Sequence, residues 1–130
     1  MKINLKERSL GFSKLSEMYI NSIKNIGICC KNNRDFERYL KLNVLCENVK
    51  IKKRGYGYLS VIKDNENIHY NGLYNEITPR GFSFDDILIT DDFKNNKHRH
   101  EIIISTIYSI SHNKDLLLKF QNEVEDLCGM

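Results

Sequence analysis

The sequence predicts an α+β fold, in which a small antiparallel sheet of three to five strands is flanked by two N-terminal and two C-terminal helices. Apolar residues recur at helical spacing before residue 45 and after residue 101, whereas the chain between them alternates with period two. Elements of one type therefore follow one another in blocks, which is typical of α+β folds rather than of parallel α/β folds. The length of 130 residues favours a single domain over residues 1–130, with the helices on one face of the sheet.

The first predicted helix covers residues 9–26. Its apolar residues step by three or four positions, as on one face of a helix: Phe12, Leu15, Tyr19, Ile23 and Ile26. Gly27 can adopt the left-handed conformation that ends a helix. A second helix is expected from Asn33, because its side chain can cap the first turn and Asp35 then lies near the positive end of the helix dipole.

The middle of the chain predicts the strands of an antiparallel meander. Residues 49–53 alternate apolar and basic side chains, and residues 56–62 are rich in the aromatic and β-branched residues that favour strands. Residues 64–67 form a turn cluster. Asn71-Gly72 is a strong hairpin signal, because both residues tolerate the positive φ of a type I′ turn.

The last part of the chain predicts two more helices after a short extended region. Residues 87–89 fit either a last strand or a short helix capped by Asp85, and residues 91–96 are expected to form an exposed loop. Asn113 is expected to cap the final helix. The apolar faces of the two helices consist of Ile103, Ile107 and Ile110 in the first and of Leu117, Phe120, Val124 and Leu127 in the second.

The charge of the chain is divided along its length. Residues 1–54 contain 13 Lys and Arg against 5 Asp and Glu, a net charge of +8, whereas residues 55–130 contain 7 against 12, a net charge of −5. Such asymmetry bears on association with partners rather than on the fold. No apolar run reaches the roughly 18–20 residues of a membrane span, and no apolar stretch follows the charged N-terminus as in a secretory signal. We therefore expect a cytoplasmic protein with no membrane partner.

The four cysteines are expected to be reduced thiols: Cys29, Cys30, Cys46 and Cys128. The adjacent pair Cys29-Cys30 does not have the spacing of a redox or zinc motif, and no other Cys or His stands at zinc-ligand spacing. At the expected C-terminal end of the first helix, the negative end of the dipole does not favour a thiolate.

No catalytic signature is present, and we expect a protein without enzymatic activity, cofactor or bound metal. The strongest hint of chemistry is His98 and His100, which are followed by Glu101. On a helix the two histidines would diverge by about 200°, and the flanking Lys97 and Arg99 oppose a divalent cation. A metal-dependent hydrolase that uses His98 and His100 is therefore the weakest of three hypotheses.

The leading hypothesis is a small interaction protein that inhibits a protein partner, such as an immunity protein, an antitoxin or a counter-defence protein. An acidic surface with aromatic anchors would match a basic partner that acts on nucleic acid. The residues expected to bind the partner are four acids and two aromatics: Asp85, Asp86, Asp91, Asp92, Tyr74 and Phe84.

The alternative is a nucleic-acid-binding module. Basic residues interleaved with aromatics can hold phosphates and stack unpaired bases. The residues expected to do so lie in one segment: Lys50, Lys52, Lys53, Arg54, Tyr56 and Tyr58. A structural interpretation of the same residues is an edge strand whose lysines prevent aggregation of sheets.

Overall fold

A computed structural model describes residues 23–75 and 84–128. Along this part of the chain five strands, three α-helices and one 3₁₀ helix follow in the order β1 (Ile23–Cys29), α2 (Asn33–Asn43), β2 (Lys50–Gly55), β3 (Tyr58–Lys63), β4 (Glu66–Leu73), β5 (Asp86–Ile89), η1 (Asp91–Asn95), α3 (Arg99–Ile110) and α4 (Lys114–Cys128). The predicted α+β class and the upper number of strands are confirmed. The predicted antiparallel character holds only for part of the sheet.

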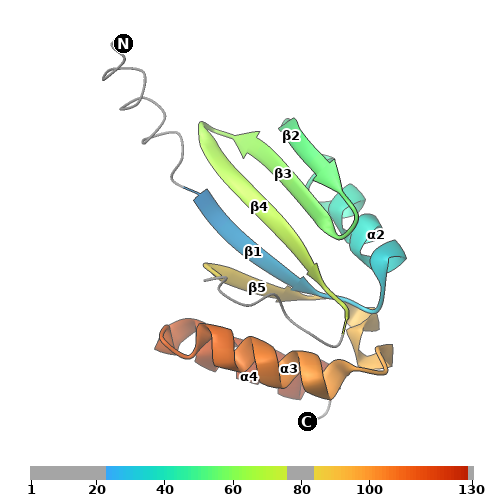
Figure 1. The fold of residues 1–130 in the computed structure, drawn as a ribbon, viewed down its shortest axis with the longest axis vertical. Helices are drawn as coiled ribbons and strands as arrows, with labels where there is room; N and C mark the ends of the chain where they lie inside the picture. Colours follow the sequence, from blue (N-terminus) through green and yellow to red (C-terminus); the bar gives the residue numbers. More distant parts are fainter. Residues whose placement is uncertain (1–22, 76–83, 129–130) are drawn as a thin grey trace.

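The five strands form one mixed sheet in the order β2-β3-β4-β1-β5 (Figure 1). β2, β3 and β4 form the expected antiparallel meander. β1 lies between β4 and β5 and is parallel to both. The carboxyl ends of these three parallel strands therefore lie side by side. Open α/β sheets bind their ligands beyond such strand ends.

The predicted helix over residues 9–26 is wrong at its end, because Ile23–Cys29 is the parallel strand β1. Residues 9–22 lie outside the described residues. Ile26 and Ile28 face the same side of the sheet at period two, and Cys29 is buried on the other side. A strand buried on both faces is apolar almost throughout, so its run of isoleucines imitates a helical stripe. Gly27 lies within this strand and does not end a helix.

Helices cover both faces of the sheet, which corrects the expectation of a single covered face. α2 packs on one face, where Phe36 and Leu40 meet side chains of β1, β3 and β4; we call this the α2 core. α3 and α4 pack on the other face at β5 and the ends of β1 and β4, where Ile102 and Phe120 join Ile87; we call this the C-terminal core. Figure 1 shows α2 behind the sheet and α3 and α4 beneath β5.

The two hairpin turns lie elsewhere than the strongest turn signal. Asn71 and Gly72 are paired residues within β4, so the predicted turn at these residues is wrong. The β3–β4 turn is made by Asp64 and Asn65, whose φ values of 51° and 65° are those of a type I′ turn. This confirms the turn expected within residues 64–67, although Glu66 and Asn67 already belong to β4.

Several expected elements of the second half are confirmed. Residues 87–89 belong to the strand β5, which decides between the two alternatives. Asn113 caps α4, because its side-chain oxygen accepts a hydrogen bond from the Leu116 amide at 3.1 Å. Residues 91–95, expected as an exposed loop, form the 3₁₀ helix η1, because Phe93 is fully buried in the C-terminal core and holds this segment down.

Helix α2 begins near the expected residue. Its cap is Asn32 rather than Asn33, since the Asn32 side chain accepts from the Asp35 amide at 2.9 Å. Asn33 is thereby left to bond outside the helix, which matters for the site described next. In the described part of the chain, no helix is long and apolar enough to cross a membrane.

Candidate nucleic-acid interface

The edge strand β2 presents three lysines that no carboxylate of the described residues neutralises. All six of its residues are exposed. Arg54 is bonded to Glu37 of α2 at 2.5 Å, but Lys50, Lys52 and Lys53 make no ion pair with any described acid. Three unpaired lysines on about 10 Å of extended chain can meet neighbouring phosphates.

The turn between β2 and β3 carries an exposed tyrosine. Tyr56 stands at its tip with 83% of its surface exposed, and Gly57 beside it has φ +70°, which a tight turn needs. The rings of Tyr56 and Tyr74 meet edge to face with centroids 6.3 Å apart. A tyrosine with one free ring face is suited to stacking a planar group.

Asn33 fixes this turn to the start of α2. Its side-chain oxygen accepts a hydrogen bond from the Gly57 amide and another from the Tyr74 hydroxyl, both at 3.2 Å. Burial and the neighbouring Tyr56 raise the pKa of Tyr74 to about 12, so its hydroxyl stays protonated and donates. The turn, the end of β4 and the helix are thus held together by one amide side chain.

A hollow of about 400 Å³ lies beside the turn, at the carboxyl ends of β1 and β4. Its cationic and aromatic lining comes from four separate connections and consists of Lys31, Tyr56, Tyr74, Lys97 and His98. The other lining residues are asparagines, and none of the described residues that line it carries a carboxylate. Such a hollow favours an anionic ligand with a planar part.

Two buried polar side chains hold the loops around the hollow in place. Asn96, 2% exposed, donates to the carbonyls of Cys30, Lys31 and Tyr74 at 2.8, 3.2 and 3.0 Å. Asp35, 4% exposed, accepts hydrogen bonds from the Lys31 amide at 2.9 Å and from the Thr90 hydroxyl at 2.5 Å. The ends of β1, β4 and β5 are therefore joined by polar contacts as well as by strand pairing.

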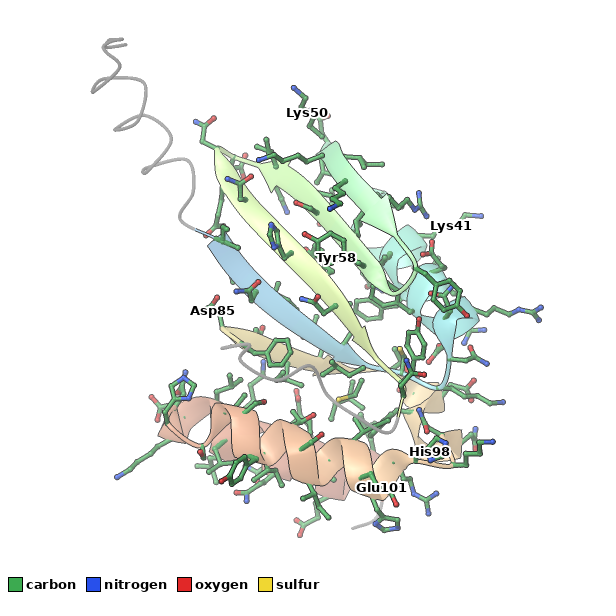
Figure 2. All side chains as sticks on the ribbon, in the orientation of Figure 1. Lys41, Lys50, Tyr58, Asp85, His98 and Glu101 are labelled. Carbon is green, nitrogen blue, oxygen red and sulfur yellow. The ribbon has the colours of Figure 1, made fainter. Side chains whose placement is uncertain are left out.

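The face of the sheet turned away from α2 is polar along β3 and β4. Leu59 and Val61 point into the α2 core, so Tyr58 and Ser60 point to the opposite side. Tyr58 and His69 lie on this side with Tyr58 Oη 3.3 Å from His69 Nδ1 and ring centroids 5.6 Å apart. Burial, followed by the charge of Lys52, lowers the pKa of His69. In Figure 2 Tyr58 lies between Lys50 and His98, in front of the sheet.

The alternative set of site residues is therefore brought together on one hairpin. Lys50, Lys52 and Lys53 lie on β2, Tyr56 at the turn and Tyr58 at the start of β3. Arg54 points to the α2 side, where it is paired with Glu37. Sequence reasoning did not place Lys31, Lys97 and His98 beside this hairpin, although it named His98 as a possible metal ligand, because only the parallel pairing of β1 with β4 and β5 brings their loops together.

The acids of the leading hypothesis are divided between the two ends of β5. Asp85 precedes the strand and accepts the Asn25 amide at 2.7 Å, and Asp86 is bonded to Lys119 of α4 at 2.7 Å. Asp92, beyond the other end, accepts from Asn95 at 2.7 Å. Asp91 is exposed beside it and has no bond of this kind within the described residues.

Neither of the two aromatics of that hypothesis is a fully exposed anchor. Phe84 is 1% exposed and belongs to the C-terminal core, so its ring is not available as a surface anchor. Tyr74 is half-buried and bonded to Asn33, and it lines the hollow beside the basic turn.

The histidines and cysteines of the described residues are not gathered into a metal-binding group. His98 precedes the first turn of α3 and His100 is exposed on that helix, and no group of three or more His, Cys, Asp or Glu side chains over 23–75 and 84–128 is placed to hold a metal ion. Cys29 and Cys30 are buried at the end of β1 and Cys46 is exposed, and none of the three forms a disulfide. Burial, with the charge of Asp35, raises the pKa of the Cys30 thiol.

Comparison with known proteins returned nothing: no model of a known protein family, no curated protein and no solved structure matches this chain.

Proposed function

We propose that this protein binds single-stranded nucleic acid along the β2–β3 hairpin and into the hollow beside its turn. The observation that supports this most is the continuity of unpaired basic groups with a hollow that has no carboxylate among its described lining residues. Lys50, Lys52 and Lys53 lead along β2 to Tyr56, and Lys31 and Lys97 continue on the far side of the turn.

The chemistry of each part matches one part of such a ligand. Lysine ammonium groups neutralise phosphates and release counterions, which gives affinity without sequence preference. The exposed ring of Tyr56 offers a face on which an unpaired base can stack, worth about 1–3 kcal/mol per base. A duplex buries its base faces, so the aromatic component favours a single strand.

Removal of the three β2 lysines tests the proposal. We expect the variant Lys50→Gln, Lys52→Gln, Lys53→Gln to bind a single-stranded oligonucleotide of about 12 nucleotides roughly a hundredfold more weakly at 0.1 M salt. The slope of log affinity against log salt should fall in magnitude by about 2, since each phosphate contact on a single strand contributes about 0.7. Fluorescence anisotropy of labelled RNA and DNA measures both quantities and shows which sugar is preferred.

A matched variant controls for the loss of charge. Lys41→Gln, Lys94→Gln, Lys114→Gln removes the same three charges from exposed positions on α2, η1 and α4. We expect its affinity to stay within about threefold of the native protein, because these lysines lie off the hairpin. Equal losses in both variants, or no binding by the native protein at low salt, would refute the proposal.

The leading hypothesis from the sequence was inhibition of a basic protein partner. It remains a prediction. Asp85, Asp86 and Asp92 already take part in contacts within the chain, and they are divided between the two ends of β5. Acids that already bond to other groups of the chain interact less strongly with a charged partner than the unpaired lysines of β2 do. For that reason we place nucleic-acid binding first.

A further inference from the structure

On the open face of the sheet, the side-chain nitrogen of one asparagine and the side-chain oxygen of another are buried without a hydrogen-bond partner. The open face is the side of β2, β3, β4 and β1 that points away from α2. Asn71 of β4 is only 6% exposed, yet its side-chain nitrogen donates to nothing, and the side-chain oxygen of Asn25 on β1 accepts nothing. The first is an unused donor and the second an unused acceptor.

These groups weaken the isolated fold. A buried polar group without a partner costs about 1–3 kcal/mol, and asparagine is disfavoured in strands even where it is satisfied. A β-branched apolar residue would suit position 71 better, since β4 is a central strand. Asn71 lowers the stability of the free protein and its side-chain nitrogen donates no hydrogen bond, which indicates that it bonds to a ligand.

The register places the two amides within reach of one planar ligand. Asn71 stands opposite Gly27 of β1, and Asn25 stands opposite His69 of β4, so the two asparagines are diagonal neighbours about 7–8 Å apart. They do not bond to each other. The edge of a nucleobase carries a hydrogen-bond donor and an acceptor side by side, which is the complement of this pair.

Rings and an apolar wall surround the pair. Tyr58 stands directly opposite Asn71, and His69 contacts the Tyr58 ring edge to face. At Gly27 the missing side chain is replaced by Leu73, Ile87 and Phe84, whose atoms lie 2.8–3.1 Å from where a Cβ would be. The amides thus lie between aromatic rings on one side and an apolar wall on the other.

We propose that the open face reads the edge of one unstacked base through Asn71 and Asn25, with Tyr58 rotating away from Asn71 to admit it. The inference rests on the proposed function and deepens it: the β2 lysines supply affinity that is indifferent to sequence, and the open face supplies base preference. Lys50 and Lys53 stand at the β2 end of this face, because they pair with Ile62 and Ser60 of β3. A strand held by these lysines can therefore place a base over β4.

The variant Asn71→Val tests the inference with two independent readouts. The native protein should distinguish 12-nucleotide homopolymers of A, C and T by about tenfold in affinity, and it should bind an abasic strand more weakly than the preferred base. In the variant this spread should shrink to within about threefold, while the salt slope stays unchanged. The melting temperature of the free variant should rise, because an unpaired buried amide has been replaced by an apolar side chain.

Asn43→Ala serves as the control, because it removes an amide side chain from an exposed position at the end of α2, away from the open face. Its base preference should equal that of the native protein. Equal affinity of the native protein for all homopolymers and for the abasic strand overturns this inference and leaves salt-dependent binding intact. A lower melting temperature of Asn71→Val overturns it as well, by showing that Asn71 supports the fold. Absence of any binding overturns both proposals.

Discussion

Single buried polar residues determine how the strand ends are joined. Asp35 bonds Thr90 after β5 and the backbone of Lys31 after β1, and it also accepts from Arg38 at 2.8 Å. The sequence predicted Asp35 only as a favourable charge in the first turn of a helix. Its contacts with distant loops could not be foreseen, because they depend on β1 and β5 being neighbours.

Replacement of Asp35 by alanine should destabilise the protein strongly. The Thr90 hydroxyl and the Lys31 amide would lose their acceptor in a buried place, so the free energy of unfolding should fall by about 2–4 kcal/mol. Urea denaturation followed by circular dichroism measures this change. Asp91→Ala, at an exposed position, should change the free energy by less than about 0.5 kcal/mol. Similar values for the two variants would contradict the role given to Asp35.

His69 should make the stability depend on pH. Burial and Lys52 lower its pKa in the folded state below the ordinary value of about 6.5, so the unfolded chain binds the proton more readily. The stabilisation is present above that ordinary value and is lost as the pH falls through the folded-state pKa. The free energy of unfolding should therefore drop from pH 7 toward pH 5.

The variant His69→Gln isolates this contribution from those of other groups. Its free energy of unfolding should fall less than that of the native protein over the same pH interval, as measured by urea denaturation at each pH. Parallel curves for the two proteins would show that His69 does not carry the effect.

At the scale of elements, local patterns predicted α2, β2, β3, α3 and α4. α2, β3, α3 and α4 each place apolar residues on a buried face, and β2 is an exposed edge strand, so each sequence shows the period of its own geometry. β1 was mistaken for the end of a helix because Ile23 and Ile26 continue the steps of three and four of the residues before them, although Ile26 and Ile28 alternate as in a strand. Asn71-Gly72 was mistaken for a turn because its local preference is outweighed by the pairing of β4 with β1 on one side and with β3 on the other.

The β2–β3 hairpin offers a sharp test of how the turn supports the hollow. Gly57→Ala places a side chain at φ +70°, and its Cβ would lie 2.8 Å from the Tyr74 hydroxyl. We expect a loss of about 1–2 kcal/mol in stability and weaker oligonucleotide binding, because Tyr74 must leave Asn33 and Tyr56. Urea denaturation and fluorescence anisotropy measure the two effects.

Gly55 provides the control on the same hairpin. A Cβ at this position meets no atom within 4 Å, so Gly55→Ala should leave both stability and binding close to the native values. If the two glycine variants behave alike, the turn does not position the hollow.

For the whole molecule, the sequence predicted the fold class, the single meander and the basic hairpin, but not the surface that they form. The unpaired lysines of β2 stay together because they share one strand, whereas Asp85 and Asp92 lie at opposite ends of β5. The hollow joins the connections after β1, β2, β4 and η1 in an arrangement set by the parallel pairing of β1.

The central claim is that the β2–β3 hairpin and the adjoining hollow form the surface that meets a single-stranded nucleic acid. Titration of the ¹⁵N-labelled protein with a 12-nucleotide oligonucleotide, followed by amide NMR spectra, tests it most directly. The account predicts that shifted resonances cluster in β2, around Tyr56 and in the loops of Lys31 and Lys97, while α3 and α4 stay unchanged. Shifts confined to the helices, or none at millimolar oligonucleotide in low salt, would contradict it.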